Sequence, residues 1–323
     1  MTTSIIEETI DPQILEMLTA RSAEISNGAS TSSALTAALA LGSIPVALAA
    51  LSRDVYAQGA LPAAIKNVLD FALALEIFEN EFYKAVLGMS AVAAVNTAFA
   101  PVRALAAAVP GAVASLQQIQ KHEAAHVATL LATGATNVFN LTATSFDFTG
   151  NRSAQGGGPF AEATTNLAFL LQVAQGAEDV GVRAYKGQVA NLMPSPTILE
   201  AALRIHSVEA RHASRIRRMR RAAAGAPIGV RWSGTVRGGE RAAAGGTTLG
   251  TVNPTVVGQT FDRIYGAGAG SPSESNIIQA GVNVSALASA SFGADAAQEA
   301  FDEPLDRADV IAIVQPFFIP TIS

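Results

Sequence analysis

The chain has 323 residues, of which 50% are hydrophobic and 15% are charged, and its formal net charge is −5. A weak negative charge of this kind excludes a general attraction for nucleic acid or for an anionic membrane surface. The sequence contains no cysteine, which excludes disulfides, zinc–thiolate sites, iron–sulfur ligation and cysteine nucleophiles. Any metal site must therefore use nitrogen and oxygen ligands.

Residues 1–60 are predicted to be a helical extension that packs on the main domain. Their least polar run, residues 33–52, is interrupted by Gly42 and Pro45, so no transmembrane segment is expected there. The run also suits the apolar part of an atypical export signal. However, the residues before it carry five acidic side chains against Arg21 alone, where a signal is expected to be basic. A cytoplasmic location is therefore preferred, with a periplasmic or exported one as the alternative.

Residues 61–224 are rich in Ala and Leu with helical periodicity, and Pro and Gly signals divide them into four long helices. The predicted helices run from Pro62 to Gly88, from Pro101 or Gly111 to Gly134, from Pro159 to about Leu192, and from Ser195 to about Gly225. Residues 135–158 form a long connection between the second and third helices, where ordinary helix hairpins need only a few residues. A long crossover between two helix pairs predicts an all-α, ferritin-like four-helix bundle.

The first and third predicted helices each offer a carboxylate in apolar surroundings. Glu178 is the candidate in the third helix, whereas Glu76, Glu79 and Glu81 compete in the first. Internal symmetry selects Glu76, because Glu76 and Glu178 each precede a Tyr-Lys pair by seven residues, as if the two halves were variants of one hairpin. Glu79 then corresponds to Gly181 and has no partner in the other half.

The second and fourth predicted helices each carry a Glu-x-x-His motif. Glu123 and His126 share one helix face, since helical neighbours lie three and four residues apart, and Glu209 and His212 repeat the arrangement. Two copies of such a motif are far less expected by chance than one. All four helices therefore contribute side chains that can bind a metal.

Electrostatics indicates what these groups hold. Four carboxylates in a bundle core would repel one another and lose hydration at a cost of about several kcal/mol each. Two divalent cations cancel the four charges, and carboxylate oxygen with neutral imidazole suits iron, with manganese as an alternative. Two such ions, roughly 3.5–4 Å apart, can bind and reduce oxygen or peroxide. The alternative is a satisfied polar network in a bundle that binds no metal.

Several stretches resemble the bacterial ferritin-like domain family, which also includes plant desiccation-related proteins. They are "ALALEIFENEFYKAVLG", the two Glu-x-x-His motifs, "AEDVGVRAYKGQ" and "AFDEPLDRADVIAIVQPF", and the resemblance covers about residues 62–222 and 299–318. Many similar proteins carry a twin-arginine export signal, where this sequence has only Arg21-Ser22. The resemblance implies that Glu76 and Glu178 are terminal ligands, that Glu123 and Glu209 bridge two ions, and that His126 and His212 each bind one ion.

Two functions are consistent with this sequence. The first is a di-metal oxidoreductase of the ferroxidase type, which acts on Fe(II), oxygen or peroxide in stress defence. The second is a non-catalytic structural or desiccation-protective protein, which could assemble with itself. Tyr83 and Tyr185, two turns after their glutamates, could relay electrons or hydrogen-bond to a metal ligand, or they could fill the core with the hydroxyl at its edge. A homo-oligomer is possible in either case.

Three further features of the helical part have weaker interpretations. His206 lies one turn before Glu209 and could support or replace a ligand, although its counterpart in the other half is Gln120. His122 lies on another face and is expected to be solvated. The arginine-rich run at 211–221 is expected to be a solvated helix end that offsets the helix dipole.

Residues 225–323 are predicted to be a loop-rich extension without a ligand cluster. Their Gly, Thr, Ser and Val content around the single Trp232 indicates irregular strands or loops. A short helix is expected to begin near Asp306 and to dock four apolar side chains on the bundle, namely Val310, Ile311, Ile313 and Val314.

Overall fold

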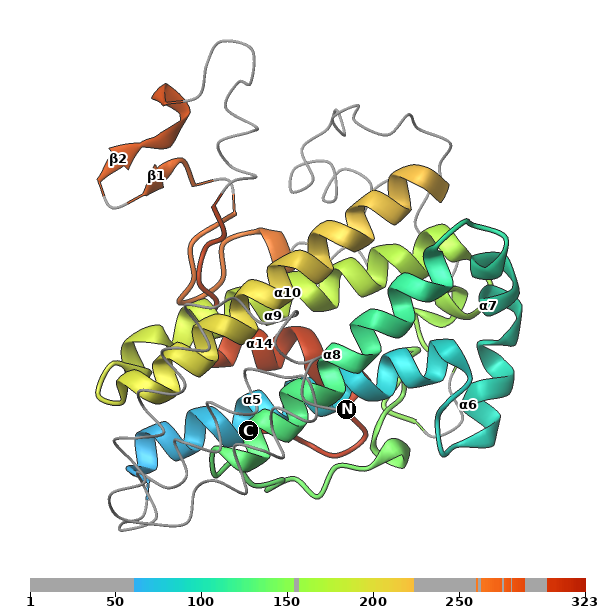
Figure 1. Ribbon diagram of the computed structural model, residues 1–323, viewed down its shortest axis with the longest axis horizontal. Coiled ribbons are helices and arrows are strands. Elements are labelled where there is room, and N and C mark those ends of the chain that lie inside the picture. The colour runs from blue at the N-terminus through green and yellow to red at the C-terminus, as the bar shows by residue number, and fades with distance from the viewer. Residues whose placement is uncertain are drawn as a thin grey trace, which may run out of the picture.

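Four long helices form the body of the computed structural model, as the sequence predicts. They are α5 (Ala63–Leu87), α8 (Ala112–Ala132), α9 (Leu167–Leu192) and α10 (Pro196–Ala223). Helix α5 packs along α8, and α9 packs along α10, so that two hairpins make one bundle (Figure 1). The structure describes residues 61–153, 157–223, 260, 263–274, 276–279, 281–287 and 301–323. The predicted N-terminal extension and Trp232 lie outside these residues.

The helix boundaries follow the glycines and one asparagine. Gly88 ends α5 in the left-handed conformation, with φ of 77°, which costs glycine little. Gly111 precedes α8 in the same conformation. The third long helix begins at Leu167 and not at Pro159, so the predicted start is wrong. Asn166 caps it by accepting a hydrogen bond from the backbone of Phe169 at 3.2 Å, which fixes the start at this residue.

Short helices fill the turns between the long ones. Residues 89–111 contain α6 (Ala93–Ala98) and α7 (Ala100–Ala107), so Pro101 lies in the first turn of α7 and does not begin the second long helix. The crossover from α8 to α9 contains the 3-10 turns η1 (Ala143–Ser145) and η2 (Ala161–Thr164). It thus extends beyond the predicted limits of 135–158 at both ends.

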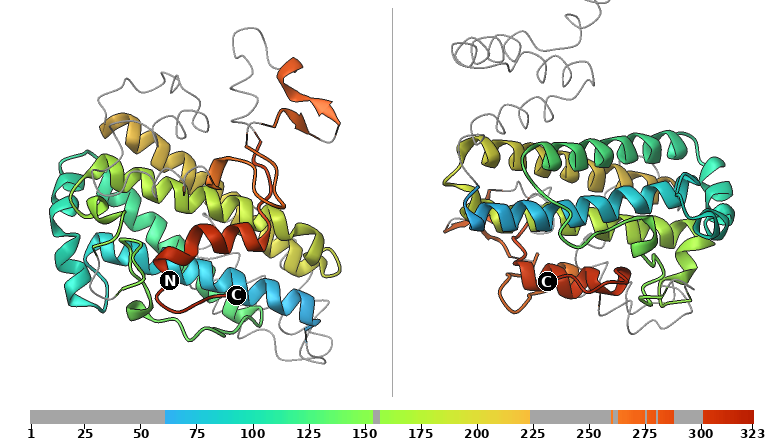
Figure 2. Two further views of the ribbon diagram at one scale, coloured as in Figure 1. Left: turned by 180° about the vertical axis from the view of Figure 1, so that it is seen from behind. Right: turned by 90° about the horizontal axis from the view of Figure 1, so that it is seen from below.

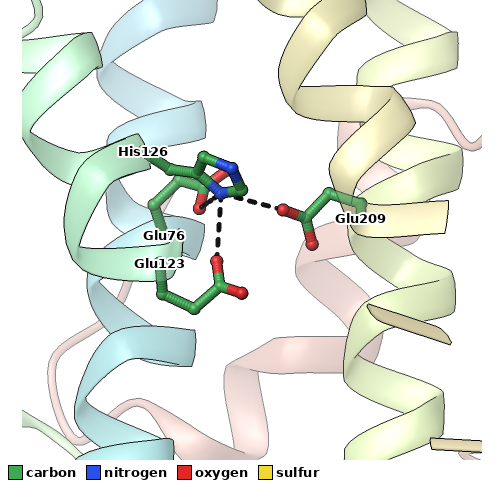
Figure 3. A group of neighbouring side chains, drawn as sticks. All are labelled: Glu76, Glu123, His126 and Glu209. Carbon is green, nitrogen blue, oxygen red and sulfur yellow. Dashed lines mark hydrogen bonds and ion pairs between the residues drawn. The ribbon is translucent and has the colours of Figure 1, made fainter. Parts of the chain in front are cut away.

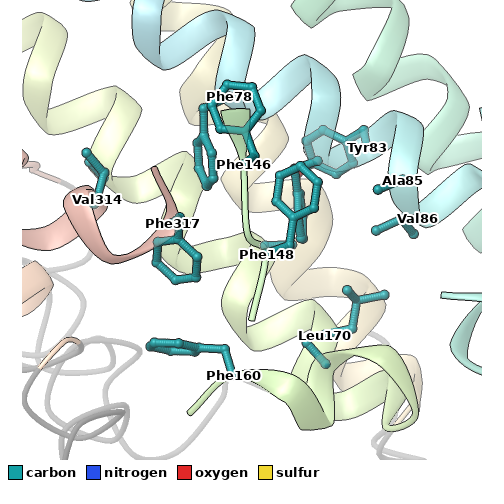
Figure 4. Packing of buried hydrophobic residues seen from close by; sticks show 14 of the residues in the cluster. Phe78, Tyr83, Ala85, Val86, Phe146, Phe148, Phe160, Leu170, Val314 and Phe317 are labelled. Carbon is teal, nitrogen blue, oxygen red and sulfur yellow. The ribbon is translucent and has the colours of Figure 1, made fainter. Parts of the chain in front are cut away.

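Phenylalanine side chains join the crossover to α5. The ring of Phe78 lies 5.8 Å from that of Phe146, 6.0 Å from that of Phe148 and 5.7 Å from that of Phe317, measured between centroids (Figure 4). Pairs of aromatic rings at such distances add to the free energy of burial. This core therefore holds together three segments that are distant in the sequence: α5, the crossover and the C-terminal end.

The C-terminal segment contains the predicted short helix, α14 (Arg307–Val314), followed by the turn η4 (Gln315–Phe317). Asp306 caps α14 by accepting a hydrogen bond from the backbone of Asp309 at 2.8 Å. The helix lies across the face that α5 and α9 form (Figure 2). Three of the four predicted docking side chains are buried and Ile311 is half-buried. The extension also contains a hairpin of β1 (Ile278–Gln279) and β2 (Val282–Asn283), followed by η3 (Val284–Ala286).

A buried arginine on α9 connects this extension to the bundle through hydrogen bonds and an ion pair. The guanidinium of Arg183 is fully buried, and it donates to the carbonyl oxygens of Glu303 and Pro272, each at 2.8 Å, and to that of Ile264. It also pairs with the buried carboxylate of Glu274 at 2.9 Å. The sequence analysis assigned no role to this residue.

Among the described residues, no helix is long and apolar enough to cross a membrane.

Candidate metal centre

The six side chains that the sequence selected as ligands come together inside the bundle. They form two groups in which the possible ligand atoms all lie within 4.8 Å of one another. One group is drawn in Figure 3. The first group contains Glu76, Glu123, His126 and Glu209, and the second contains Glu123, Glu178, Glu209 and His212. Glu123 and Glu209 belong to both groups, so two ions could share them.

In each group, one imidazole nitrogen faces three carboxylates. The Nδ1 atom of His126 lies 3.0 Å from Glu76 Oε2, 3.1 Å from Glu123 Oε2 and 2.9 Å from Glu209 Oε1 (Figure 3). A ring nitrogen carries at most one hydrogen, so it can donate to only one of the three oxygens. The remaining oxygens converge without a donor, which is how ligands surround a cation.

The second group repeats this arrangement. The Nδ1 atom of His212 lies 2.8 Å from Glu123 Oε1, 3.2 Å from Glu178 Oε2 and 3.9 Å from Glu209 Oε2. It differs from the first group in that the distance to Glu209 is longer. The two groups are therefore similar in composition but not identical in geometry.

Three of the four oxygens of the two shared carboxylates lack hydrogen bonds. Among the described residues, Glu123 Oε1 and both carboxylate oxygens of Glu209 are buried and accept no hydrogen bond, although His212 and His126 approach them at ion-pair distance. A buried acceptor without a donor costs about 1–3 kcal/mol, and more when it is charged. Metal ions would satisfy these oxygens. The donor set of carboxylates and imidazoles, with no thiolate, fits iron or manganese.

In the absence of a metal ion, side chains of the cluster bind protons more tightly than they would in water. Burial raises the pKa of Glu76 from 4.5 to about 7, although the neighbouring His126 lowers it. Burial lowers the pKa of His212, but Glu178 and Glu123 overcome this effect and raise that pKa from 6.5 to about 11. Burial and the charge of Glu123 raise the pKa of Glu209 well above its usual range. The cluster thus favours bound positive charge.

Two buried tyrosines hold the outer carboxylates. The hydroxyl of Tyr185 donates to Glu76 Oε1 at 2.6 Å, and the hydroxyl of Tyr83 donates to Glu178 Oε1. Each tyrosine thus holds a glutamate of the other helix pair, and the second oxygen of that glutamate faces the imidazole. Burial and the nearby carboxylates raise the pKa of both tyrosines well above 10. Both hydroxyls therefore remain protonated donors inside the core, and neither lies at its edge.

His122 is half-buried and so only partly solvated, where the sequence predicts a solvated side chain. Its Nδ1 atom lies 2.8 Å from Nε2 of His212, and the two rings are stacked with centroids 5.1 Å apart. Burial and the neighbouring His212 lower the pKa of His122 from 6.5 to about 4, so its ring is neutral. Its other nitrogen lies 2.7 Å from the side-chain amide of the exposed Gln118. A polar chain thus leads from one candidate ligand to the surface.

His206 and Gln120 do not belong to either group. The Nδ1 atom of His206 lies 2.9 Å from the carbonyl oxygen of Val182 on α9, which gives it a structural partner away from the cluster. Gln120 donates to Asn80 at 3.0 Å. A role of His206 as a substitute ligand has no support in this geometry.

The arginine-rich end of α10 is also only partly solvated. Arg215 donates to Ser115 at 2.8 Å, and Arg217 pairs with the buried carboxylate of Asp179 on α9. Only some members of the run, such as Arg211, are exposed. The expectation of a solvated helix end is therefore wrong for the arginines that face α8 and α9.

One buried carboxylate was set aside at the sequence level. Glu79, one turn after Glu76 on α5, is only 3% exposed, and burial with the charges of Glu209 and Glu76 raises its pKa well above 4.5. Periodicity did place it in an apolar row, which was the available signal. Glu79 was removed from the ligand candidates because the equivalent position in the other helix pair, Gly181, carries no acid. That comparison did not consider that a glycine there leaves room for the Glu79 side chain.

Together, the two helix pairs, the long crossover and the buried carboxylate–histidine groups define a ferritin-like helical bundle with a possible metal site. A family model described as a ferritin-like domain matches residues 65–222. Residues 65–222 therefore form a ferritin-like domain. No curated protein and no solved structure gives a significant match.

Proposed function

We propose that the cluster holds two divalent ions, iron or alternatively manganese, and that the protein is a ferroxidase-type oxidoreductase that acts on Fe(II), oxygen or peroxide. The observation that carries this proposal is the pair of buried groups that share Glu123 and Glu209. Two ions held by common carboxylates lie close enough to act on one small molecule. A single structural ion would not need two imidazoles and two sets of oxygens.

The proposed ligand roles follow from the contacts. Glu123 and Glu209 would bridge the ions, since each belongs to both groups. Glu76 and Glu178 would be terminal ligands, since each gives one oxygen to a tyrosine and keeps the other for the cluster. When bound, the ions would supply open coordination positions and would exchange electrons with the substrate.

The protein's own residues would prepare the site in three ways. The imidazoles of His126 and His212 would release their protons when an ion binds, because a ligand nitrogen needs a free lone pair. The two tyrosine hydroxyls would hold the terminal carboxylates in one orientation. The burial of the whole cluster would exclude bulk water, which strengthens every electrostatic contact inside it.

The first experiment measures metal content. Elemental analysis of protein purified without added metal should give close to two iron or manganese ions per chain, in line with the two groups. A Glu76→Ala/Glu178→Ala variant should lose them, whereas Glu81→Gln should keep them, because Glu81 pairs with Lys84 outside the cluster. No metal in any of the proteins, even after anaerobic loading with Fe(II) or Mn(II), would refute the proposed centre.

The second experiment tests catalysis. Metal-loaded protein should consume oxygen during Fe(II) oxidation, or should destroy peroxide, faster than a Glu123→Ala/Glu209→Ala variant. Equal rates, with two ions bound to the parent protein, would favour the alternative of a structural or desiccation-protective protein stabilised by its metal. A mass measurement in solution would test the proposed homo-oligomer in either case.

A further inference from the structure

Glu79 borders the same space as Glu209 but belongs to neither group of proposed ligands, and the proposed ligand roles leave it unexplained. It is nearly fully buried on α5, one turn after Glu76. In the described part of the chain, its carboxylate accepts no hydrogen bond and forms no ion pair. A buried carboxylate without such a partner is unstable unless a positive charge lies nearby or a proton neutralises it.

The space around Glu79 is made by a glycine on the opposite helix. A Cβ atom built on Gly181 of α9 would lie 3.3 Å from Glu79 Oε1 and 3.2 Å from Glu209 Oε2. Both carboxylates therefore border the volume that a side chain at Gly181 would occupy. Gly181 is also the counterpart of Glu79 in the internal symmetry of the two helix pairs. Glu79 on α5 therefore lies next to the space that the missing side chain of Gly181 leaves on α9.

We propose that Glu79 is a fifth carboxylate of the metal centre, which reaches the ions through the space left by Gly181. This proposal rests on the two-ion function proposed above. The other four carboxylates already balance the charge of two divalent ions, so Glu79 adds one negative charge to the pair. Because α9 offers no equivalent acid, this charge makes the two halves of the centre unequal.

A titration with Mn(II) alone tests the proposal on the metal-free, full-length protein. The signal of free Mn(II) in electron paramagnetic resonance gives the number of bound ions and their dissociation constants. Glu79→Gln keeps the shape of the side chain and removes its charge. We expect it to raise the dissociation constant of at least one Mn(II) ion by about tenfold or more. Glu81→Gln is the matched control, since Glu81 lies on the same helix and pairs with Lys84 at 2.7 Å. Its dissociation constants should equal those of the parent protein.

Thermal melting separates ligation from a structural role. The metal-free Glu79→Gln protein should melt no lower than the parent, because the carboxylate has no hydrogen bond to lose, while its gain in melting temperature on adding Mn(II) should be smaller. Gly181→Ala provides a second variant. Its methyl group should crowd both Glu79 and Glu209 and weaken Mn(II) binding, although alanine favours a helix more than glycine does; Glu79→Gln is therefore the variant that tests Glu79 alone.

Two results would overturn the proposal, and one of them would leave the two-ion function intact. If the parent binds two ions and Glu79→Gln binds them equally well, Glu79 is only a space-filling acid. A lower metal-free melting temperature with unchanged binding would lead to the same conclusion. If the parent itself binds no Mn(II) or Fe(II), the proposed function fails first and Glu79 loses its role with it.

Discussion

Replacing Tyr185 with phenylalanine tests whether the tyrosines orient metal ligands. The substitution removes the hydroxyl that donates to Glu76 Oε1 at 2.6 Å and leaves that buried oxygen without its donor. A hydrogen bond to a charged group contributes about 1.5–3 kcal/mol. At 1.36 kcal/mol per factor of ten, this corresponds to roughly 10- to 150-fold in an equilibrium constant. The figure is an upper bound for metal affinity, because the hydrogen bond is already present before the metal binds.

The expected loss of affinity is about 10- to 100-fold, the range found when the outer partner of a metal ligand is removed. Titration with Mn(II) measures this loss, and urea denaturation of the metal-free protein measures the change in stability. Tyr265→Phe is the matched control, because Tyr265 is buried and its hydroxyl donates to the Asp179 carboxylate at 2.7 Å, outside the cluster. If Tyr185→Phe and Tyr265→Phe bind Mn(II) equally well, the tyrosine does not orient Glu76 for metal binding.

Three further predictions concern neighbouring residues. Arg183→Met should lower the free energy of unfolding in urea by about 3–5 kcal/mol, because it breaks the buried ion pair with Glu274 and removes the hydrogen bonds to the carbonyl groups of Glu303 and Pro272; a change below about 1 kcal/mol would contradict this. His122→Phe keeps the stacked ring but removes the nitrogen next to His212, so one of two Mn(II) dissociation constants should rise about tenfold while the other stays unchanged. The metal-free protein should lose stability above pH 6.5, because the folded state raises the pKa of His212 to about 11 and stays protonated where the unfolded chain does not. Thermal melts at several pH values measure this, and a rise in stability above pH 6.5 would refute the assignment.

The sequence predicted most of the bundle because its signals are local. Pro62 and Gly88 bound the first helix within one or two residues, and the repeated Glu-x-x-His spacing placed the imidazoles on the faces that meet. The third helix was drawn too early because Pro159 is a start signal, whereas the cap is provided by Asn166 seven residues later. A proline permits a helix start but does not require one.

The residues that were misread depend on distant parts of the chain. His122 was expected to be solvated from its own helix, but His212 on α10 packs against one side of its ring. Arg183 looked like any helical cation, yet its guanidinium binds carbonyl groups from residues 264–303, far away in the sequence. The role proposed for Glu79 is a separate case, and it would depend on the absence of a side chain at Gly181. Hydrophobic periodicity describes one helix at a time, so it does not predict contacts between side chains of different elements.

The centre also links the folding of the two helix pairs. The α5–α8 pair supplies Glu76, Glu123 and His126, and the α9–α10 pair supplies an equivalent set, so neither pair completes an ion site alone. The tyrosines strengthen this dependence, because each holds a carboxylate of the opposite pair. Contacts within a pair are also more extensive than contacts between pairs. Ions that bind only the closed bundle stabilise it by about 2.7 kcal/mol at a concentration one hundred times the dissociation constant. Metal binding should therefore raise the cooperativity of the bundle as well as its stability, since the two pairs separate only when the ions are released.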